Sequence, residues 1–132
     1  MNKPRIVLIV DDDEDDQSLF FDAVKEVDDT TLCISARDGQ EALDLLKNKQ
    51  TELPDFIFLD LNMPRVNGKQ CLIEIKKQPG LDNIPVVIYS TSRRAEDVEE
   101  MKKLGAFQFL TKPALFSEIC DVISNVFSTY KV

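Results

Sequence analysis

The sequence contains no histidine, and only 3 of its 132 residues are cysteine. Without histidine, the chain lacks the most frequent general base of enzymes. The cysteines (Cys33, Cys71 and Cys120) are far apart, form no Cys-x-x-Cys pair and each follow or precede apolar residues. We therefore expect buried, reduced thiols and neither a disulfide framework nor a thiolate metal site. Any chemistry must use carboxylates, hydroxyls, lysine or a bound metal.

Long apolar runs and an excess of positive charge are also missing. No run approaches the ~20 apolar residues that span a bilayer, and the short N-terminal run meets acidic residues at once, unlike a signal peptide. We therefore expect no membrane contact and a cytoplasmic location. The net charge of −8 argues against direct nucleic-acid binding, which relies on Lys and Arg. The length predicts a single domain over residues 1–132.

Short apolar runs alternate with segments that have helical spacing of apolar residues. The predicted strands cover residues 5–10, 31–36, 56–59, 86–89 and 107–110. Helices are expected between and after them, the last over residues 115–130. Because parallel strands need a covering crossover, this alternation predicts an α/β protein with a doubly wound parallel sheet and helices on both faces.

Two of these helices have clear apolar faces. The helix after the first strand is expected to pack through Leu19 and its helical neighbours Phe20 and Val24. The last helix is expected to present Leu115 and Phe116 on its apolar side. The acidic residues 13–16 are interpreted as first-turn residues that suit the positive end of a helix dipole.

Polar side chains follow four of the predicted strands. Asp11 and Asp12 come after the first strand, Asp60 after the third, Ser90 after the fourth and Lys112 after the fifth. The carboxyl ends of parallel strands lie at one edge of the sheet, where such folds bind ligands. Pro64 and the Asn-Gly pair at residues 67–68 predict a turn behind Asp60. This edge is therefore the predicted functional site.

The charges at this edge indicate phosphoryl chemistry. Carboxylates brought together raise one another's pKa, and a hard cation such as Mg²⁺, bound through oxygen, removes the conflict. Lys112 supplies a second positive charge, and Asp60 is placed to attack a phosphoryl group and form an aspartyl phosphate. Ser90 would donate a hydrogen bond to a phosphoryl oxygen. We also expect a cis bond between Lys112 and Pro113 that turns the lysine toward the acids.

These residues resemble the receiver domain of a two-component response regulator, over residues 6–127. The resemblance implies a flavodoxin-like sheet of five strands in the order 2-1-3-4-5 with five helices. It also implies a role for each residue of the site. Asp60 would be the phosphoacceptor. Mg²⁺ would be bound by Asp12, Asp60 and the backbone carbonyl of Asn62, and Asp11 would act on the metal through water. Lys112 would contact the phosphate, and Ser90 and Phe109 would be the switch residues.

Some positions depart from the family's usual residues. Ser90 stands where threonine is commoner, Phe109 where tyrosine is common and Asn67 where aspartate is frequent. None of these departures removes a group that the chemistry needs. Asn62 and Ser92, each two residues beyond a site residue, are expected to control the access of water to the phosphorylated aspartate.

The resemblance also implies partners. We expect a sensor histidine kinase or a phosphotransfer protein as the phosphoryl donor. Because the chain ends soon after the last predicted helix, we expect a single-domain regulator of the chemotaxis or phytochrome type. Its output would pass to a protein effector that binds residues 95–130. The chain would catalyse only its own phosphorylation and dephosphorylation, as a monomer or weak homodimer.

Two other functions remain open from the residues alone. A Mg²⁺-dependent phosphohydrolase resembling the haloacid dehalogenases would need an acid two residues after its nucleophile, where this chain has Asn62. A scaffold module that is never phosphorylated would have no need of the acidic set or of Lys112. Both alternatives are therefore ranked below the receiver.

Overall fold

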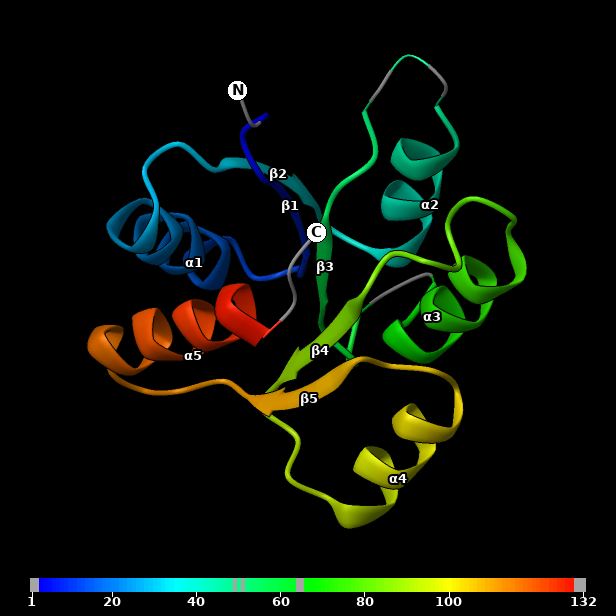
Figure 1. Cartoon of the computed structure of the whole chain (residues 1–132). Helices are drawn as coiled ribbons and strands as arrows, with labels where there is room; N and C mark the ends of the chain where they lie inside the picture. The colour runs from blue at the N-terminus through cyan, green and yellow to red at the C-terminus, as the bar shows by residue number, and fades with distance from the viewer. Residues whose placement is uncertain (1–2, 49, 51, 64–65, 130–132) are drawn as a thin grey trace.

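The structure, a computed structural model, describes residues 3–48, 50, 52–63 and 66–129. In this part of the chain, strands and helices alternate five times (Figure 1). The elements are β1 (Ile6–Val10), α1 (Glu14–Val27), β2 (Leu32–Ala36), α2 (Gly39–Lys47), β3 (Phe56–Leu59), α3 (Gly68–Lys77), β4 (Val86–Ser90), α4 (Ala95–Lys103), β5 (Gln108–Thr111) and α5 (Phe116–Thr129). Pro64, in the predicted turn behind Asp60, and Tyr130, the last residue of the predicted final helix, lie outside the described residues.

The strands form one parallel sheet in the order β2-β1-β3-β4-β5. Figure 1 shows α1 and α5 on one face of the sheet and α2, α3 and α4 on the other. This arrangement confirms the predicted doubly wound fold and its strand order. The chain adds β2 on one side of β1 and the later strands on the other side, so the topological switch point lies between β1 and β3. Open α/β sheets bind their ligands at this point.

The core has two parts, one on each face of the sheet. Successive residues of a strand point to opposite faces. In β1, Leu8 and Val10 therefore pack under α2, α3 and α4, whereas Val7 and Ile9 pack with α1 and α5. Every residue of β3 and of β4 is buried, which agrees with their unbroken apolar runs.

Side chains at three helix starts fix where those helices begin. The Asp13 carboxylate accepts hydrogen bonds from the backbone N–H groups of Asp15 and Asp16 at the start of α1. Asp38 caps α2 in the same way, by accepting a hydrogen bond from the Glu41 N–H. Asn67 and Gln70 form a reciprocal capping box at α3. Each of these helices follows a strand of the parallel sheet, so the helix N-termini lie at the edge where the strands end.

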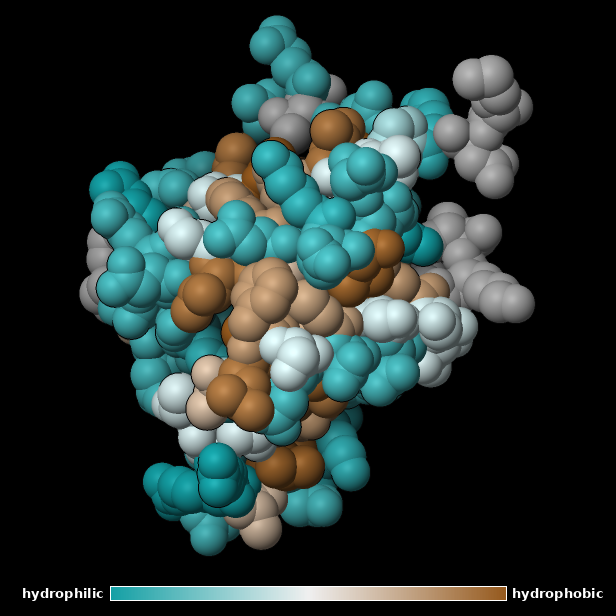
Figure 2. Space-filling model, turned by 90° about the vertical axis from the view of Figure 1, so that its left-hand side faces the viewer, coloured by the Kyte–Doolittle hydropathy of each residue, from teal (hydrophilic) through white to brown (hydrophobic). Residues whose placement is uncertain are grey.

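Three apolar side chains expected in the core are exposed. Leu19 in α1 is 45% exposed, and Leu115 and Phe116 at the start of α5 are 61% and 41% exposed. Phe20 takes the core-facing position beside Leu19, and Leu115 precedes the first residue of α5. The face that carries α1 and α5 accordingly shows brown and tan apolar patches among polar surface (Figure 2).

The three cysteines are free thiols, as predicted. Only Cys71 is fully buried, and burial raises the pKa of its thiol to about 12. Cys33 and Cys120 are partly exposed, so the expectation of burial was wrong for these two. Each helix in the described part of the chain is too short or too polar to cross a bilayer.

Candidate functional site

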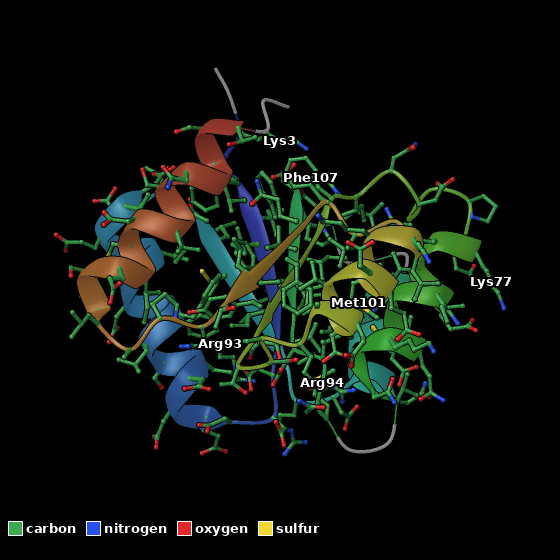
Figure 3. All side chains as sticks on the ribbon, turned by 90° about the horizontal axis from the view of Figure 1, so that it is seen from below. Lys3, Lys77, Arg93, Arg94, Met101 and Phe107 are labelled. Carbon is green, nitrogen blue, oxygen red and sulfur yellow. The ribbon has the colours of Figure 1, made fainter. Side chains whose placement is uncertain are left out.

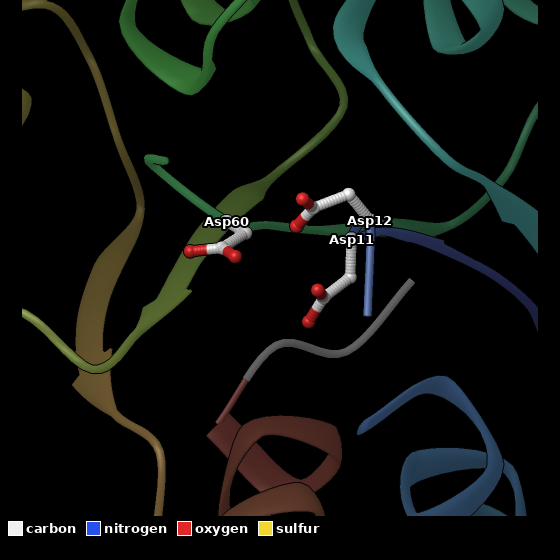
Figure 4. Close-up of side chains that lie close together, drawn as sticks. All are labelled: Asp11, Asp12 and Asp60. Atoms are coloured by element: carbon white, nitrogen blue, oxygen red, sulfur yellow. The ribbon is translucent and has the colours of Figure 1, made fainter. Parts of the chain in front are cut away.

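The predicted acids meet where β1 and β3 end side by side. The Asp60 N–H donates to the Val10 carbonyl at 3.0 Å, and the Asp11 N–H donates to the Ala36 carbonyl at 3.0 Å. These bonds extend the sheet's hydrogen-bond ladder by one residue and fix the backbone of both acids. One carboxylate oxygen from each of Asp11, Asp12 and Asp60 lies within 4.8 Å of the other two (Figure 4).

The three acids differ in burial. Asp11 is 1% exposed, Asp60 is 8% exposed and Asp12 is exposed. Burial raises the pKa of Asp11, although the hydrogen bonds from Lys112 and from the Asp13 N–H act in the opposite direction. An ionised carboxylate at Asp11 therefore depends on nearby positive charge, which the protein or a cation must supply.

Lys112 provides that charge from the end of β5. Its Nζ lies 2.7 Å from Asp11 Oδ2, 2.9 Å from Asp16 Oδ2 and 3.5 Å from Asp60 Oδ2. The lysine side chain is only 9% exposed. Burial alone would lower the pKa of Lys112, but the hydrogen bonds to Asp11 and Asp16 and the charge of Asp60 outweigh it and raise the pKa. Lys112 is therefore a permanent cation at neutral pH.

The bond between Lys112 and Pro113 is trans, so the predicted cis bond was wrong. The Lys112 N–H donates to the Ser90 carbonyl at 2.8 Å and continues the pairing of β5 with β4. This pairing already aims the lysine side chain at the acids. No change of peptide geometry at the proline is needed to bring the ammonium to Asp11.

Asp16 belongs to the site, although the sequence was interpreted as placing it only in the first turn of α1. The ion pair with Lys112 spans 96 positions of the chain. Gln17 fixes this turn, because its Nε2 donates to the Asp11 carbonyl at 2.6 Å and to the Ala36 carbonyl at 3.2 Å. The sequence feature that could have placed Asp16 in the site is its position in the first turn of a helix, because this turn begins at the sheet edge where the other acids lie.

Ser90 lies at the end of β4 with its side chain fully buried. Its Oγ accepts a hydrogen bond from the Ser92 N–H at 3.3 Å. The Ser92 hydroxyl in turn donates to Asp97 in α4 at 2.5 Å. A chain of hydrogen bonds therefore leads from the predicted switch hydroxyl to the first turn of α4.

Phe109 shares the face of the sheet that Ser90 occupies. It pairs in register with Ile88, and both pack in the core beneath α2, α3 and α4. Ser90 comes two residues after Ile88, so its side chain points to the same face. Phe109 is partly buried. The two predicted switch residues are therefore neighbours on adjacent strands.

The loop behind Asp60 approaches it closely at Gly68. A Cβ at this position would lie 2.2 Å from the Asp60 carbonyl oxygen and 2.7 Å from Leu61 Cα. The Gly68 N–H donates to the Leu61 carbonyl at 3.0 Å. Glycine at the start of α3 thus allows the loop to support the backbone of Asp60. Asn62 is exposed at the mouth of the site.

A shallow groove of about 480 Å³ lies beside Lys112. Arg93 lies in the loop between β4 and α4 (Figure 3). Its side chain lines the groove. The other lining residues are Thr111, Lys112, Pro113, Glu118, Asp121 and Val122. The groove therefore connects the site to the start of α5.

The donor set fits a hard divalent cation. All of the clustered side-chain ligands are carboxylate oxygens, and the buried Asp11 is poorly solvated. Such ligands suit ions of the Mg²⁺ and Mn²⁺ type better than softer metals, which prefer imidazole or thiolate. The cluster is thus compatible with divalent metal binding.

Comparison with known proteins identifies the family. The model of the response regulator receiver domain matches residues 7–124, which is most of the chain. The chain belongs to this family. Receivers of two-component systems are signalling domains phosphorylated on aspartate, and this protein is a response regulator of that phosphorelay type rather than a conventional enzyme.

Individual relatives agree with this assignment. The chain is 31% identical to Response regulator Rcp1 of Synechocystis sp. over 129 residues, covering 95% of this chain and 88% of Rcp1. It is 30% identical to the polar-differentiation response regulator DivK of Brucella anthropi, covering 92% of this chain and 95% of DivK.

Solved structures show the same fold. The crystal structure of the Mn²⁺-bound form of Rcp1 superposes with a TM-score of 0.83 at 31% identity, covering 98% of this chain and 97% of Rcp1. The phosphorylated cyanobacterial phytochrome response regulator RcpA superposes with a TM-score of 0.88 at 29% identity, covering 97% of each chain. A phosphohydrolase function is not favoured by these relationships.

Proposed function

We propose that Asp60 accepts a phosphoryl group from a phosphohistidine donor in a Mg²⁺-dependent reaction. The observation that carries this proposal is the convergence of Asp11, Asp12 and Asp60 within 4.8 Å, with the Lys112 ammonium 3.5 Å from Asp60. The Asp60 backbone is fixed by its hydrogen bond to Val10, and the residue is 8% exposed at the carboxyl end of β3.

Asp11, Asp12, Asp60 and the backbone carbonyl of Asn62 would hold the ion. Asp12 is the exposed member of the acidic set, and Asp11 is buried behind it. A bound Mg²⁺ would neutralise charge on the phosphoryl oxygens. The related Rcp1 has a Mn²⁺-bound form, which supports binding of a divalent ion by this chain.

Lys112 and Ser90 would complete the site. The lysine would neutralise a second phosphoryl oxygen, and Asp60 would act as the in-line nucleophile. The Ser90 hydroxyl would then exchange its bond from the Ser92 N–H for a bond to the phosphoryl group. Phe109, on the same face of the sheet, would change its packing as Ser90 moves.

The output surface would be residues 95–130. Met101 is the one buried side chain of α4 in the described chain, so this helix is attached weakly to the core. Phosphorylation would shift the population of two arrangements of α4 and its neighbours, and an effector protein would bind one of them. Residues 1–132 would form one receiver that catalyses only its own phosphorylation and dephosphorylation. A cytoplasmic location, no direct nucleic-acid binding and a monomer or weak homodimer remain predictions.

The test is the intact mass of the purified protein after incubation with acetyl phosphate. With Mg²⁺ we expect a gain of one phosphoryl group, and we expect no gain after chelation of the metal or in Asp60→Asn. Asp44→Asn makes the same change on the exposed side of α2 and should behave as the wild type. Equal modification of Asp60→Asn and the wild type would refute the assignment.

A further inference from the structure

Three carboxylates accept hydrogen bonds from the Lys112 ammonium. An ammonium group has three N–H donors, and here its three nearest acceptors are Asp11, Asp16 and Asp60. The two short contacts, 2.7 and 2.9 Å, go to Asp11 and Asp16, whereas Asp60 is at 3.5 Å. In the unphosphorylated protein the ammonium is therefore held nearer to Asp16 than to the residue that it is expected to serve.

The backbone around Asp16 is held in place. The Asp16 N–H donates to the N-cap carboxylate of Asp13 at 3.1 Å, and Gln17 ties the same turn to the ends of β1 and β2. Lys112, in contrast, reaches the site on a long side chain with several rotatable bonds. When the two groups separate, we expect the lysine side chain to move while the Asp16 backbone stays in place.

Asp16 also stands outside the set of acids that could share a cation, which comprises Asp11, Asp12 and Asp60. Its carboxylate is 34% exposed. It therefore acts on the site mainly through its charge and through its hold on Lys112. A negative charge at this place attracts a cation to the neighbouring cluster and repels an anion that arrives at Asp60.

We propose that Asp16 is a positioning residue that restrains Lys112 and thereby sets the threshold for phosphorylation. The inference rests on the proposed function of Asp60. While Asp16 holds the ammonium, Lys112 stays 3.5 Å from Asp60 and competes less with a divalent cation for that carboxylate. A phosphoryl group on Asp60 must draw Lys112 away from Asp16 before it gains the full neutralising charge.

The test compares Asp16→Asn with Asp15→Asn. Asp15 is the preceding residue of the same turn, is exposed, and has no contact with Lys112 among the described side chains. Both variants lose one acid from the start of α1, so both lose the same helix-dipole contribution. Calorimetric titration measures Mg²⁺ affinity. Fluorine NMR at saturating Mg²⁺ measures the affinity for beryllofluoride, an unreactive analogue of a phosphoryl group on aspartate.

We expect Asp16→Asn to shift the two affinities in opposite directions. Mg²⁺ affinity should fall and beryllofluoride affinity should rise, each by about threefold or more, while Asp15→Asn changes either by clearly less. A merely structural role would weaken both affinities together. Such a parallel loss, unchanged affinities, or equal shifts in the two variants would overturn the inference.

The wild type separates this inference from the proposed function. Wild-type protein that binds beryllofluoride only with Mg²⁺ supports the function, whatever Asp16 does. If the wild type fails to bind beryllofluoride at saturating Mg²⁺, the proposed role of Asp60 fails, and the inference about Asp16 fails with it.

Discussion

Lys112 balances the charge of the site when no cation is bound. Its ammonium contacts Asp11, Asp16 and Asp60, and Asp11 is almost fully buried. Removing one partner of a buried ion pair leaves an uncompensated charge, which costs more than the pair itself contributes. The lysine is thus important for folding as well as for phosphoryl chemistry.

We predict that Lys112→Ala lowers the free energy of unfolding by about 3 kcal/mol at neutral pH without divalent cations. Urea denaturation measures this change. Saturating Mg²⁺ should restore part of the loss, because the cation would replace the missing charge beside Asp11. Lys77→Ala, on the exposed side of α3, is the matched control. A loss that Mg²⁺ does not reduce would contradict this account of the charge balance.

The charges of the site also predict how the difference in unfolding free energy between Lys112→Ala and the wild type depends on pH. The pKa of Asp11 is raised by burial above its ordinary value of 3.8, so the folded protein binds a proton there more readily than the unfolded chain. The cost of leaving Asp11 unpaired is therefore present above its folded pKa and is relieved as the pH falls through it. The difference between Lys112→Ala and the wild type should shrink in acid. A difference that stays constant from neutral pH to pH 3.8 would be inconsistent with an ionised Asp11.

Asn62 and Ser92 control the lifetime of the phosphate in our account. Asn62 is exposed two residues after Asp60, and the Ser92 hydroxyl is held by Asp97. A longer side chain in Asn62→Met, or the added methyl group in Ser92→Thr, should obstruct the attacking water and slow dephosphorylation by about threefold. The decay of phosphorylated protein, followed by mass spectrometry after removal of the donor, measures the rate. Decay at the wild-type rate in both variants would remove this role.

At the scale of elements, the start of α3 supports Asp60. The first residue of this helix touches the Asp60 backbone, because glycine there allows a close approach that any side chain would block. The other acids gain support from the first turn of α1. Two helix N-termini therefore determine the geometry of the acids, in addition to the strands that carry them.

Gly68→Ala is predicted to destabilise the protein by about 2 kcal/mol or more and to impair phosphorylation, because the new Cβ would displace the backbone of Asp60. Gly80→Ala is the informative control. Gly80 has a φ of 89° and nothing within 4 Å of a Cβ. That variant should lose about 1 kcal/mol to backbone strain and keep its phosphorylation. Thermal denaturation and acetyl phosphate labelling measure the two effects, and equal labelling of both variants would contradict the role of Gly68.

At the scale of the whole molecule, cation binding must stabilise the fold. A ligand that binds only the folded protein raises the apparent stability with its concentration. The chain carries a net charge of −8, so ordinary salt also reduces repulsion. A comparison at constant ionic strength separates the specific from the general effect.

We predict that Mg²⁺ raises the Tm of the wild type by several degrees at constant ionic strength and that Asp12→Asn loses most of this increase. Asp12 is exposed, so its substitution should leave the fold intact. Asp44→Asn, which removes an acid distant in sequence from the cluster, should keep the full increase. A similar increase in Asp12→Asn and the wild type would show that the ion binds elsewhere.

The fold could be predicted because its signals are local. Unbroken apolar runs marked β3 and β4, and the short connections required parallel pairing. The acids, the hydroxyl and the lysine could be predicted as one site because parallel strands end at one edge.

The remaining features depend on how the elements sit in space. Helical spacing indicated that Leu19 and Phe20 lie close together, but only packing decides which of them faces the sheet. The Lys112–Pro113 bond is trans, and a proline in the sequence does not by itself specify its isomer. The contact between Asp16 and Lys112 depends on the placement of the first turn of α1 over the sheet edge.

The central claim is that Asp60 itself carries the phosphoryl group. The most direct measurement is reduction of the acetyl phosphate-treated protein with borohydride, which converts an aspartyl phosphate to homoserine, followed by peptide sequencing by mass spectrometry. We predict homoserine at position 60, dependent on Mg²⁺ during labelling. Homoserine at position 11 or 12 would contradict the account. Labelling that proceeds equally well without Mg²⁺ would also contradict it.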